Sequence, residues 1–159
     1  MDEATRKLLE ANDDPIGCEV PANDWSSFGY KDLQLSVSHL QASLATELSL
    51  HFERDGSVQD ASFHDQLWIV DPTPRRIHGV MTIVSAITIR FSNFGRLYTI
   101  SSALPEGFGS YPVDRIRSII EGAGWTYVPA EELDEIYDGK NERLRDGKTT
   151  WWIRFFDYL

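Results

Sequence analysis

The first part of the chain predicts one short helix followed by a loop. Residues 2–11 gather Ala4, Leu8 and Leu9 on one side and begin with two acids, which suit the positive end of a helix. Residues 12–32 are rich in Asp, Asn, Gly and Pro, which favour turns over regular elements. We therefore expect an N-terminal helix and then a long loop-rich connection.

Two stretches then alternate apolar and polar side chains at every second residue. Residues 33–38 and residues 48–53 both show this pattern, and a period of two is typical of half-buried strands. Residues 39–46, between them, fit either a loop or a helical turn. The sequence therefore predicts two strands here.

Asp55 and Gly56 predict a tight hairpin after the second of these strands. A type I′ turn needs positive φ at both central residues, and the pair Asp-Gly satisfies that need well. A two-residue loop would set Leu48 opposite Phe63, which brings apolar side chains together on one face. We expect the strand to return from this turn.

The middle of the chain predicts a second hairpin. Residues 72–76 contain two prolines and two arginines and are expected to form a loop. A long strand should run from about residue 80 to residue 92, and residues 96–101 should return beside it with apolar side chains on both faces. Residues 93–95 suit a three-residue loop with Gly95 in the left-handed conformation.

The last third predicts two helices and two strands. Residues 112–122 and residues 129–139 each begin with proline and end near glycine, and each has apolar residues at helical spacing. Residues 125–128 suit a short strand, and residues 140–148 a charged loop. Residues 149–158 have large aromatic side chains on both alternating faces, which favours a final strand inside a sheet.

Together these elements predict one α+β domain over residues 1–159. We expect a mainly antiparallel sheet built from hairpins, with two C-terminal helices packed on one face and a short N-terminal helix. The length of 159 residues and a hydrophobic content of 42% provide enough material for one core without a metal or disulfide.

The charge balance favours a protein partner over nucleic acid or membrane. The chain has 25 acidic and 15 basic residues, a net charge of −10, and residues 1–80 alone carry −8. A field of this sign repels phosphate backbones and anionic lipids and attracts basic surfaces. The same charge also serves solubility alone.

The cysteine content and the N-terminus predict a cytoplasmic protein. Cys18 is the single cysteine, so no disulfide forms within the chain, and a lone thiol suits a reducing compartment. The first residues lack the basic start and apolar run of a secretory signal, and the most apolar stretch, residues 80–89, is too short to span a bilayer.

An acidic cluster on the second predicted C-terminal helix is the first candidate site. Such a face could meet a basic partner, because complementary potentials raise association rates. A solvated helix face would show the same composition. The partner-binding candidates are Glu131, Glu132, Asp134, Glu135, Tyr137 and Asp138.

A glycine-bearing loop before the helix at residue 112 is a weaker candidate for binding an anion. Free N–H groups at a helix start can hold a phosphate. The loop lacks the third glycine of a dinucleotide fingerprint and the Gly-Lys-Ser/Thr of a P-loop, so an ordinary turn explains it as well. The anion-site candidates are Gly107, Gly109, Ser110 and Arg115.

No motif in the chain predicts catalysis, a metal or a cofactor. A Gly-x-Ser-x-Gly elbow, a Ser-x-x-Lys pair and a cysteine-protease signature are all missing. His51 would face Asp60 on the predicted hairpin, but no third residue of a catalytic or metal-binding set accompanies them. We therefore assign no catalytic residue, metal ligand or cofactor from the sequence.

Three functional hypotheses remain from the sequence. The first is an acidic, cytosolic protein-binding module, of which an immunity or antitoxin-type protein that covers a basic toxin is one version. The second is a domain or enzyme of unidentified class that binds a small anionic molecule at the glycine-bearing loop. The third is a subunit that forms homo-oligomers through exposed aromatic residues.

Overall fold

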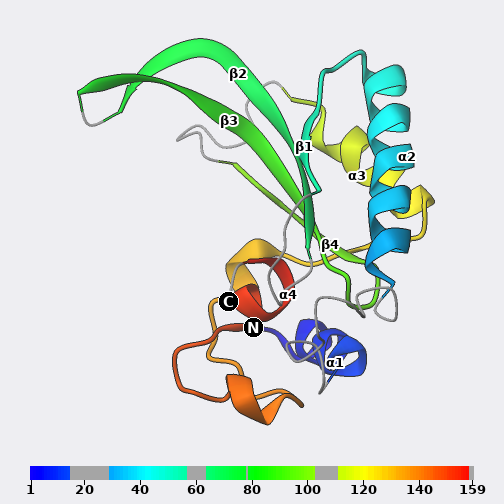
Figure 1. The fold of residues 1–159 in the computed structure, drawn as a ribbon, viewed down its shortest axis with the longest axis vertical. Helices are drawn as coiled ribbons and strands as arrows, with labels where there is room; N and C mark the ends of the chain where they lie inside the picture. Colours follow the sequence, from blue (N-terminus) through cyan, green and yellow to red (C-terminus); the bar gives the residue numbers. More distant parts are fainter. Residues whose placement is uncertain (15–28, 57–63, 78, 103–110, 158–159) are drawn as a thin grey trace.

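The computed structural model describes residues 1–14, 29–56, 64–77, 79–102 and 111–157. These residues form an α+β fold with one five-stranded open sheet, whose strands lie in the order β1-β2-β3-β4-β5 (Figure 1). All neighbouring strands are antiparallel except β4 and β5, which are parallel. The strands are β1 (Glu53–Asp55), β2 (Asp65–Ile77), β3 (Val80–Phe91), β4 (Leu97–Ser101) and β5 (Thr126–Tyr127).

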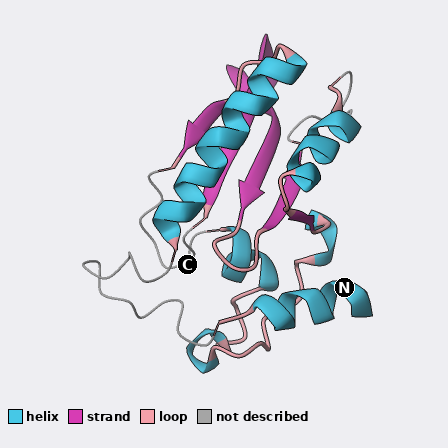
Figure 2. Cartoon of the chain, turned by 90° about the vertical axis from the view of Figure 1, so that its right-hand side faces the viewer, coloured by secondary structure: helices cyan, strands magenta, loops and turns pink. Residues whose placement is uncertain are grey.

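Helices α2 (Tyr30–Leu48) and α3 (Val113–Gly122) cover one face of the sheet (Figure 2). Their buried residues, which include Leu44 and Ile116, pack against the inward side chains of β2, β3 and β4. The buried residues of α2 are spaced by 3, 4, 3 and 4 positions, which places them on one side of an α-helix. They are Tyr30, Leu33, Val37, Leu40 and Leu44.

A second, smaller core lies at the other end of the sheet, where α1 (Glu3–Asn12) and α4 (Trp151–Phe156) are found (Figure 1). Before α4, the chain makes two short 3₁₀ turns, η2 (Ala130–Glu132) and η3 (Glu142–Leu144). Aromatic side chains dominate this core, with the rings of Tyr137 and Trp151 packed edge to face. The first and last parts of the chain are therefore packed into one cluster.

The strand predicted at residues 33–38 is wrong, because this segment is the first half of helix α2. The undecided segment 39–46 is its second half. Leu33 and Val37 lie four residues apart, which fits both a strand face and a helix face. Leu35 separates the two interpretations, since its side chain is 60% exposed while Leu33 and Val37 are buried.

The hairpin predicted at Asp55 and Gly56 is also wrong. The strand here comprises only residues 53–55, and Asp55 pairs with Gln66, ten residues beyond the expected tight turn. The predicted loop at residues 72–76 is instead part of β2, which continues to Ile77 with an irregular register between Asp71 and Arg75. The proline residues are tolerated because no described strand pairs with that edge of β2.

The two predicted C-terminal helices are only half correct. Residues 113–122 form α3, but the segment from Pro129 makes only the short turn η2. The final strand predicted at residues 149–158 is helix α4 in its described part, with the Thr150 hydroxyl accepting a hydrogen bond from the Ile153 amide. The sheet face is therefore covered by α2 and α3, not by two C-terminal helices.

Several predictions from periodicity are confirmed. Helix α1, strands β3 and β4, helix α3 and strand β5 lie where the apolar patterns place them. Gly95 adopts positive φ in the turn between β3 and β4, as expected. Arg96 also adopts positive φ, and the amide of Ser92 donates to the carbonyl of Leu97, so the loop is one residue longer than predicted.

Candidate functional site

The outer halves of β2 and β3 project beyond the helices as a two-stranded ribbon (Figure 1). We call residues 69–77 of β2 and 80–87 of β3 the distal ribbon; its base, at Ile69 and Ile87, is still buried in the main core. Strand β1 pairs only with residues 66–68 of β2, and β4 pairs only with residues 88–91 of β3. Within the described parts of the chain, neither outer edge of the distal ribbon is paired with another strand.

The distal ribbon exposes a cluster of large apolar side chains. Val80, Met81 and Ile83 are 63%, 58% and 57% exposed. Among the described residues, the other large apolar side chains with comparable exposure are Leu35 and Ile136, which belong to different segments. Single exposed apolar residues are ordinary on protein surfaces. Met81 and Ile83 lie two residues apart on one strand and therefore share a face, where they form an apolar patch typical of contact surfaces, while Val80 points to the other face.

A β-bulge determines which face of the ribbon carries this patch. Ile69 pairs with Ile87 and Val70 with Ser85, so Ala86 is an extra residue in β3. The extra residue reverses the alternation of side chains beyond it. Consequently Ile83 and Met81 lie on the face opposite to Ile87, which is buried beneath α2.

The charge of the ribbon differs from that of the rest of the chain. Beyond the buried Asp71 at the base of the ribbon, residues 72–89 contain two arginines, Arg75 and Arg76, and no acidic residue, which gives +2. Since the whole chain carries −10, the remaining residues carry −12. The exposed side chain of Arg76 lies on this basic, apolar ribbon.

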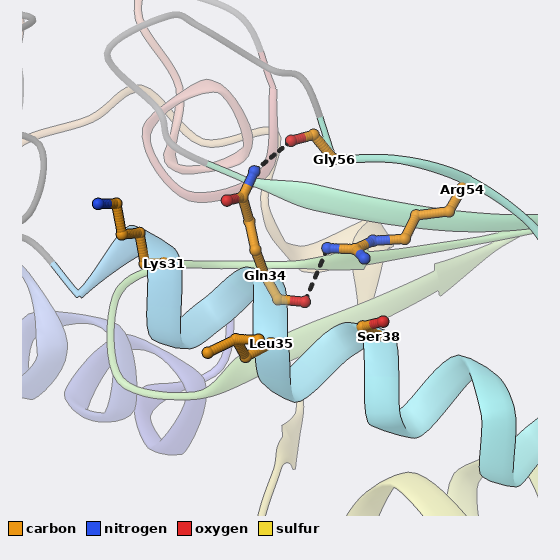
Figure 3. A pocket seen from close by; sticks show the side chains of 6 residues that line it. All are labelled: Lys31, Gln34, Leu35, Ser38, Arg54 and Gly56. Atoms are coloured by element: carbon orange, nitrogen blue, oxygen red, sulfur yellow. Dashed lines mark hydrogen bonds between the residues drawn. The ribbon is translucent and has the colours of Figure 1, made fainter.

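A separate open groove of about 640 Å³ lies between α2 and β1 (Figure 3). The side chain of Gln34 donates to the carbonyl of Gly56, and Arg54 Nη2 donates to the carbonyl of Gln34 at 2.8 Å. The lining residues are Lys31, Gln34, Leu35, Ser38, Arg54 and Gly56.

The arginine of this groove is engaged by a buried carboxylate. Arg54 Nε and Nη2 donate to Asp65 at 3.0 and 2.5 Å, and the Asp65 side chain has no exposed surface. Burial raises the pKa of Asp65, and the hydrogen bonds from Arg54 oppose that rise. The Arg54 guanidinium therefore joins α2 to β1 and β2, and its hydrogen bonds to Asp65 and Gln34 explain its place in the groove without a ligand.

The predicted acidic cluster does not form one helix face, and three of its members contact helix α1. Glu135 contacts the N-terminal amino group, and Arg6 donates to Glu135 at 2.6 Å and to Asp138 at 2.8 Å. The backbone N–H of Asp2 donates to Glu132 at 2.8 Å. Hydrogen bonds with these groups lower the pKa of Glu135 and of Asp138.

The other members of the predicted cluster are placed differently. Glu131 and Asp134 are exposed, whereas Tyr137 is buried in the smaller core. The Tyr137 hydroxyl donates to Asp13 at 2.5 Å and accepts from the backbone N–H of Asn141 at 2.8 Å. The six residues thus divide between surface, ion pairs within the chain and core.

Only one residue of the predicted anion site lies in the described part of the chain. Arg115 is exposed on α3, where its Nη2 lies 3.5 Å from the carbonyl oxygen of Glu47. Gly107, Gly109 and Ser110 lie outside the described residues. The anion-binding prediction therefore stays untested, because the structure does not describe the loop that would bind the anion.

The pair of His51 and Asp60 considered in the sequence also gains no geometry from the described residues. His51 is exposed, and its expected partner Asp60 lies outside the described residues, as does Cys18. Among the residues that the structure describes, no group of three or more His, Cys, Asp or Glu side chains could hold a metal ion. In the same residues, no helix combines the length and the apolar character needed to cross a bilayer.

Comparisons with known proteins give no relative for this chain. No family model, curated protein sequence or solved structure matches it. The distal ribbon is therefore interpreted from its own geometry. A signal for it was present in the sequence, since residues 80–89 are the most apolar stretch and carry no charge. The sequence does not show that Val80, Met81 and Ile83 are exposed, because exposure depends on how much of the sheet the helices cover.

Proposed function

We propose that this protein is a protein-binding module that contacts another polypeptide chain through the distal ribbon. The observation that carries the proposal is the exposure of Val80, Met81 and Ile83 on a ribbon whose outer edges no described strand covers. Burying one such side chain stabilises a complex by about 1.5–3 kcal/mol, so Met81 and Ile83, which share a face, can together anchor a partner.

The unpaired strand edges support a contact made by the backbone as well as by side chains. Edge strands present rows of N–H and C=O groups that can pair with a strand of another chain. Strand addition of this kind combines main-chain hydrogen bonds with apolar contacts on one face. The ribbon provides both at residues 80–85.

The charge of the remaining chain supports a partner that carries basic residues. A body of −12 attracts such a partner and steers its approach. An immunity or antitoxin-type role, in which the acidic body covers a basic toxin, is the narrower form of this proposal, and charge alone supports it. Glu135 and Asp138 are exposed as well, but their ion pairs with Arg6 partly neutralise them, so they contribute less to this attraction than Glu131 and Asp134.

A photo-crosslinking experiment in cells that naturally express the protein tests this proposal. A photoreactive amino acid is placed at Met81, and the matched control carries it at Leu35, which is 60% exposed on α2. We expect a defined adduct on denaturing gels from position 81 and not from position 35. The proposal is wrong if position 81 gives no adduct, or if both positions give the same one.

A further inference from the structure

We infer that the chain that docks on the distal ribbon is a second copy of this protein, paired edge to edge and antiparallel along β3 about a twofold axis near Ile83. This inference rests on the proposed function, since it names the occupant of the same surface. It is argued from three features of the ribbon: the difference between its two edges, the composition of β3 and the distribution of charge.

The two edges of the ribbon differ in how well they resist strand addition. In β2 the outer half contains Pro72 and Pro74, which lack the backbone N–H that pairing requires, and its register is irregular between Asp71 and Arg75. Proline and irregular register are the devices by which proteins protect an edge strand. The run Val80–Ile87 of β3 has neither proline nor charge. Its edge is occupied at Ala86, whose carbonyl accepts a hydrogen bond from the Ser102 hydroxyl at 2.9 Å, so among the described residues the edge at residues 80–85 is the one available for pairing.

The composition of β3 suits pairing with itself. Five of the eight residues from Val80 to Ile87 are β-branched, and none of the eight is charged. When the run pairs with its own copy in antiparallel orientation, every register sets uncharged side chains opposite uncharged ones. Pairing over residues 80–85 provides about six main-chain hydrogen bonds, and a twofold axis near Ile83 makes the two Ile83 side chains neighbours.

The distribution of charge favours the antiparallel arrangement of the two ribbons. In that arrangement the tip of each ribbon lies beside the body of the other copy. The tip region, residues 72–89, carries +2 and the rest of each chain carries −12, so the net charges of the two parts that approach each other are opposite in sign. A parallel arrangement would instead bring the two basic tips together.

The mass of the protein in solution tests this inference directly. Light scattering on gel-filtered protein and sedimentation velocity, from about 1 to 100 μM, are expected to show twice the chain mass of 18.1 kDa. The variant Ile83→Lys places two like charges side by side at the axis, and we expect its dimer dissociation constant to rise at least about tenfold. Leu35→Lys, at similar exposure on α2, is expected to leave dimerisation unchanged.

Mixing oppositely charged variants tests whether the two Ile83 side chains face each other in the dimer. Ile83→Lys and Ile83→Glu are each expected to be monomeric at concentrations where the unchanged protein is dimeric, and an equimolar mixture is expected to recover a dimer. Circular dichroism checks that each variant is folded, which the 57% exposure of Ile83 leads us to expect. A monomer at all concentrations, or a dimer that Ile83→Lys leaves intact, would overturn the inference.

The crosslinking experiment distinguishes failure of this inference from failure of the proposed function. An adduct from position 81 with twice the chain mass supports both. An adduct with a different protein, together with a monomer in solution, keeps the proposed function and overturns the second copy as the occupant. No adduct at position 81 overturns both.

Discussion

The carboxylate of Asp13 connects residues that are far apart in the chain. It accepts hydrogen bonds from Arg154 Nε at 2.9 Å, from the Tyr137 hydroxyl at 2.5 Å and from the Lys140 amide at 2.6 Å. The side chains of Asp13 and Arg154 are both fully buried, and the guanidinium also stacks over the Phe94 ring at 4.0 Å. This buried ion pair fixes the end of α1 against α4.

Replacing Asp13 with alanine should therefore be strongly destabilising. Arg154 would keep its charge without its carboxylate partner, and breaking a buried pair in this way costs about 3–5 kcal/mol. Urea denaturation followed by tryptophan fluorescence measures the change in the free energy of unfolding. Asp114→Ala, at an exposed position of α3, is the control and should change it little. A loss below about 1 kcal/mol for Asp13→Ala would contradict the structural role.

Gly139 is required because no room is left for a side chain at this position. A Cβ at this position would collide with Asp13 Oδ2 and would lie 2.6 Å from the Tyr137 ring, so the network around Asp13 would have to move. We expect Gly139→Ala to lower the free energy of unfolding by about 1–3 kcal/mol. Gly122→Ala, in the last turn of α3 with open space around it, should raise it by up to about 1 kcal/mol. Thermal denaturation of both variants should show opposite shifts of Tm.

At the scale of elements, α1 is attached to the fold by both ion pairs and apolar contacts. Arg6 binds Glu135 and Asp138, while Leu9 is fully buried in the smaller core. Ion pairs near the surface contribute little because water screens them. The burial of Leu9 should therefore matter more than the charges.

A comparison of Leu9→Ala with Arg6→Ala tests this order. We expect Leu9→Ala to cost about 2–5 kcal/mol in the free energy of unfolding and Arg6→Ala about 1 kcal/mol or less. Chemical denaturation at low and high salt measures both. If Arg6→Ala costs as much as Leu9→Ala and the loss disappears at high salt, the ion pairs are the principal attachment.

The elements also show where sequence patterns can and cannot be read. Strand β3 and helix α3 were predictable because each pattern is long enough to distinguish the periods of 2 and 3.6. Residues 33–38 are too few, since Leu33 and Val37 fit both periods. Residues 151–156 are apolar or aromatic except for Arg154, so no period can be recognised there and the contacts of the smaller core decide the conformation.

The whole molecule contains buried tyrosines in both cores. Burial is the main cause that raises the pKa of Tyr30 to about 12, and the nearby negative charge of Asp65 adds to it. Burial, followed by the hydrogen bond to Asp13, raises the pKa of Tyr137 to about 12. An ordinary tyrosine in an unfolded chain has a pKa near 10. Both cores therefore favour the neutral phenol.

This predicts a loss of stability in alkali. A group whose pKa is higher in the folded state contributes stability that is complete below the unfolded pKa, here about 10, and is lost as the pH rises through 12. Urea midpoints should therefore fall between these pH values, and the tyrosinate absorbance of Tyr30 and Tyr137 should appear together with unfolding. The double variant Tyr30→Phe/Tyr137→Phe should show a shallower fall, and an identical fall would refute the assignment.

The sequence by itself determined the α+β class, the mainly antiparallel sheet, the long strand β3 and the amphipathic helix α3, because each depends on a local alternation of apolar and polar residues. Only the tertiary structure decided that residues 30–48 form a helix over the sheet and that residues 151–156 complete a second core. It also decided that Val80, Met81 and Ile83 stay exposed. The physical reason is that burial is a property of neighbours distant in sequence, and the bulge at Ala86 and the ends of the helices determine which neighbours exist.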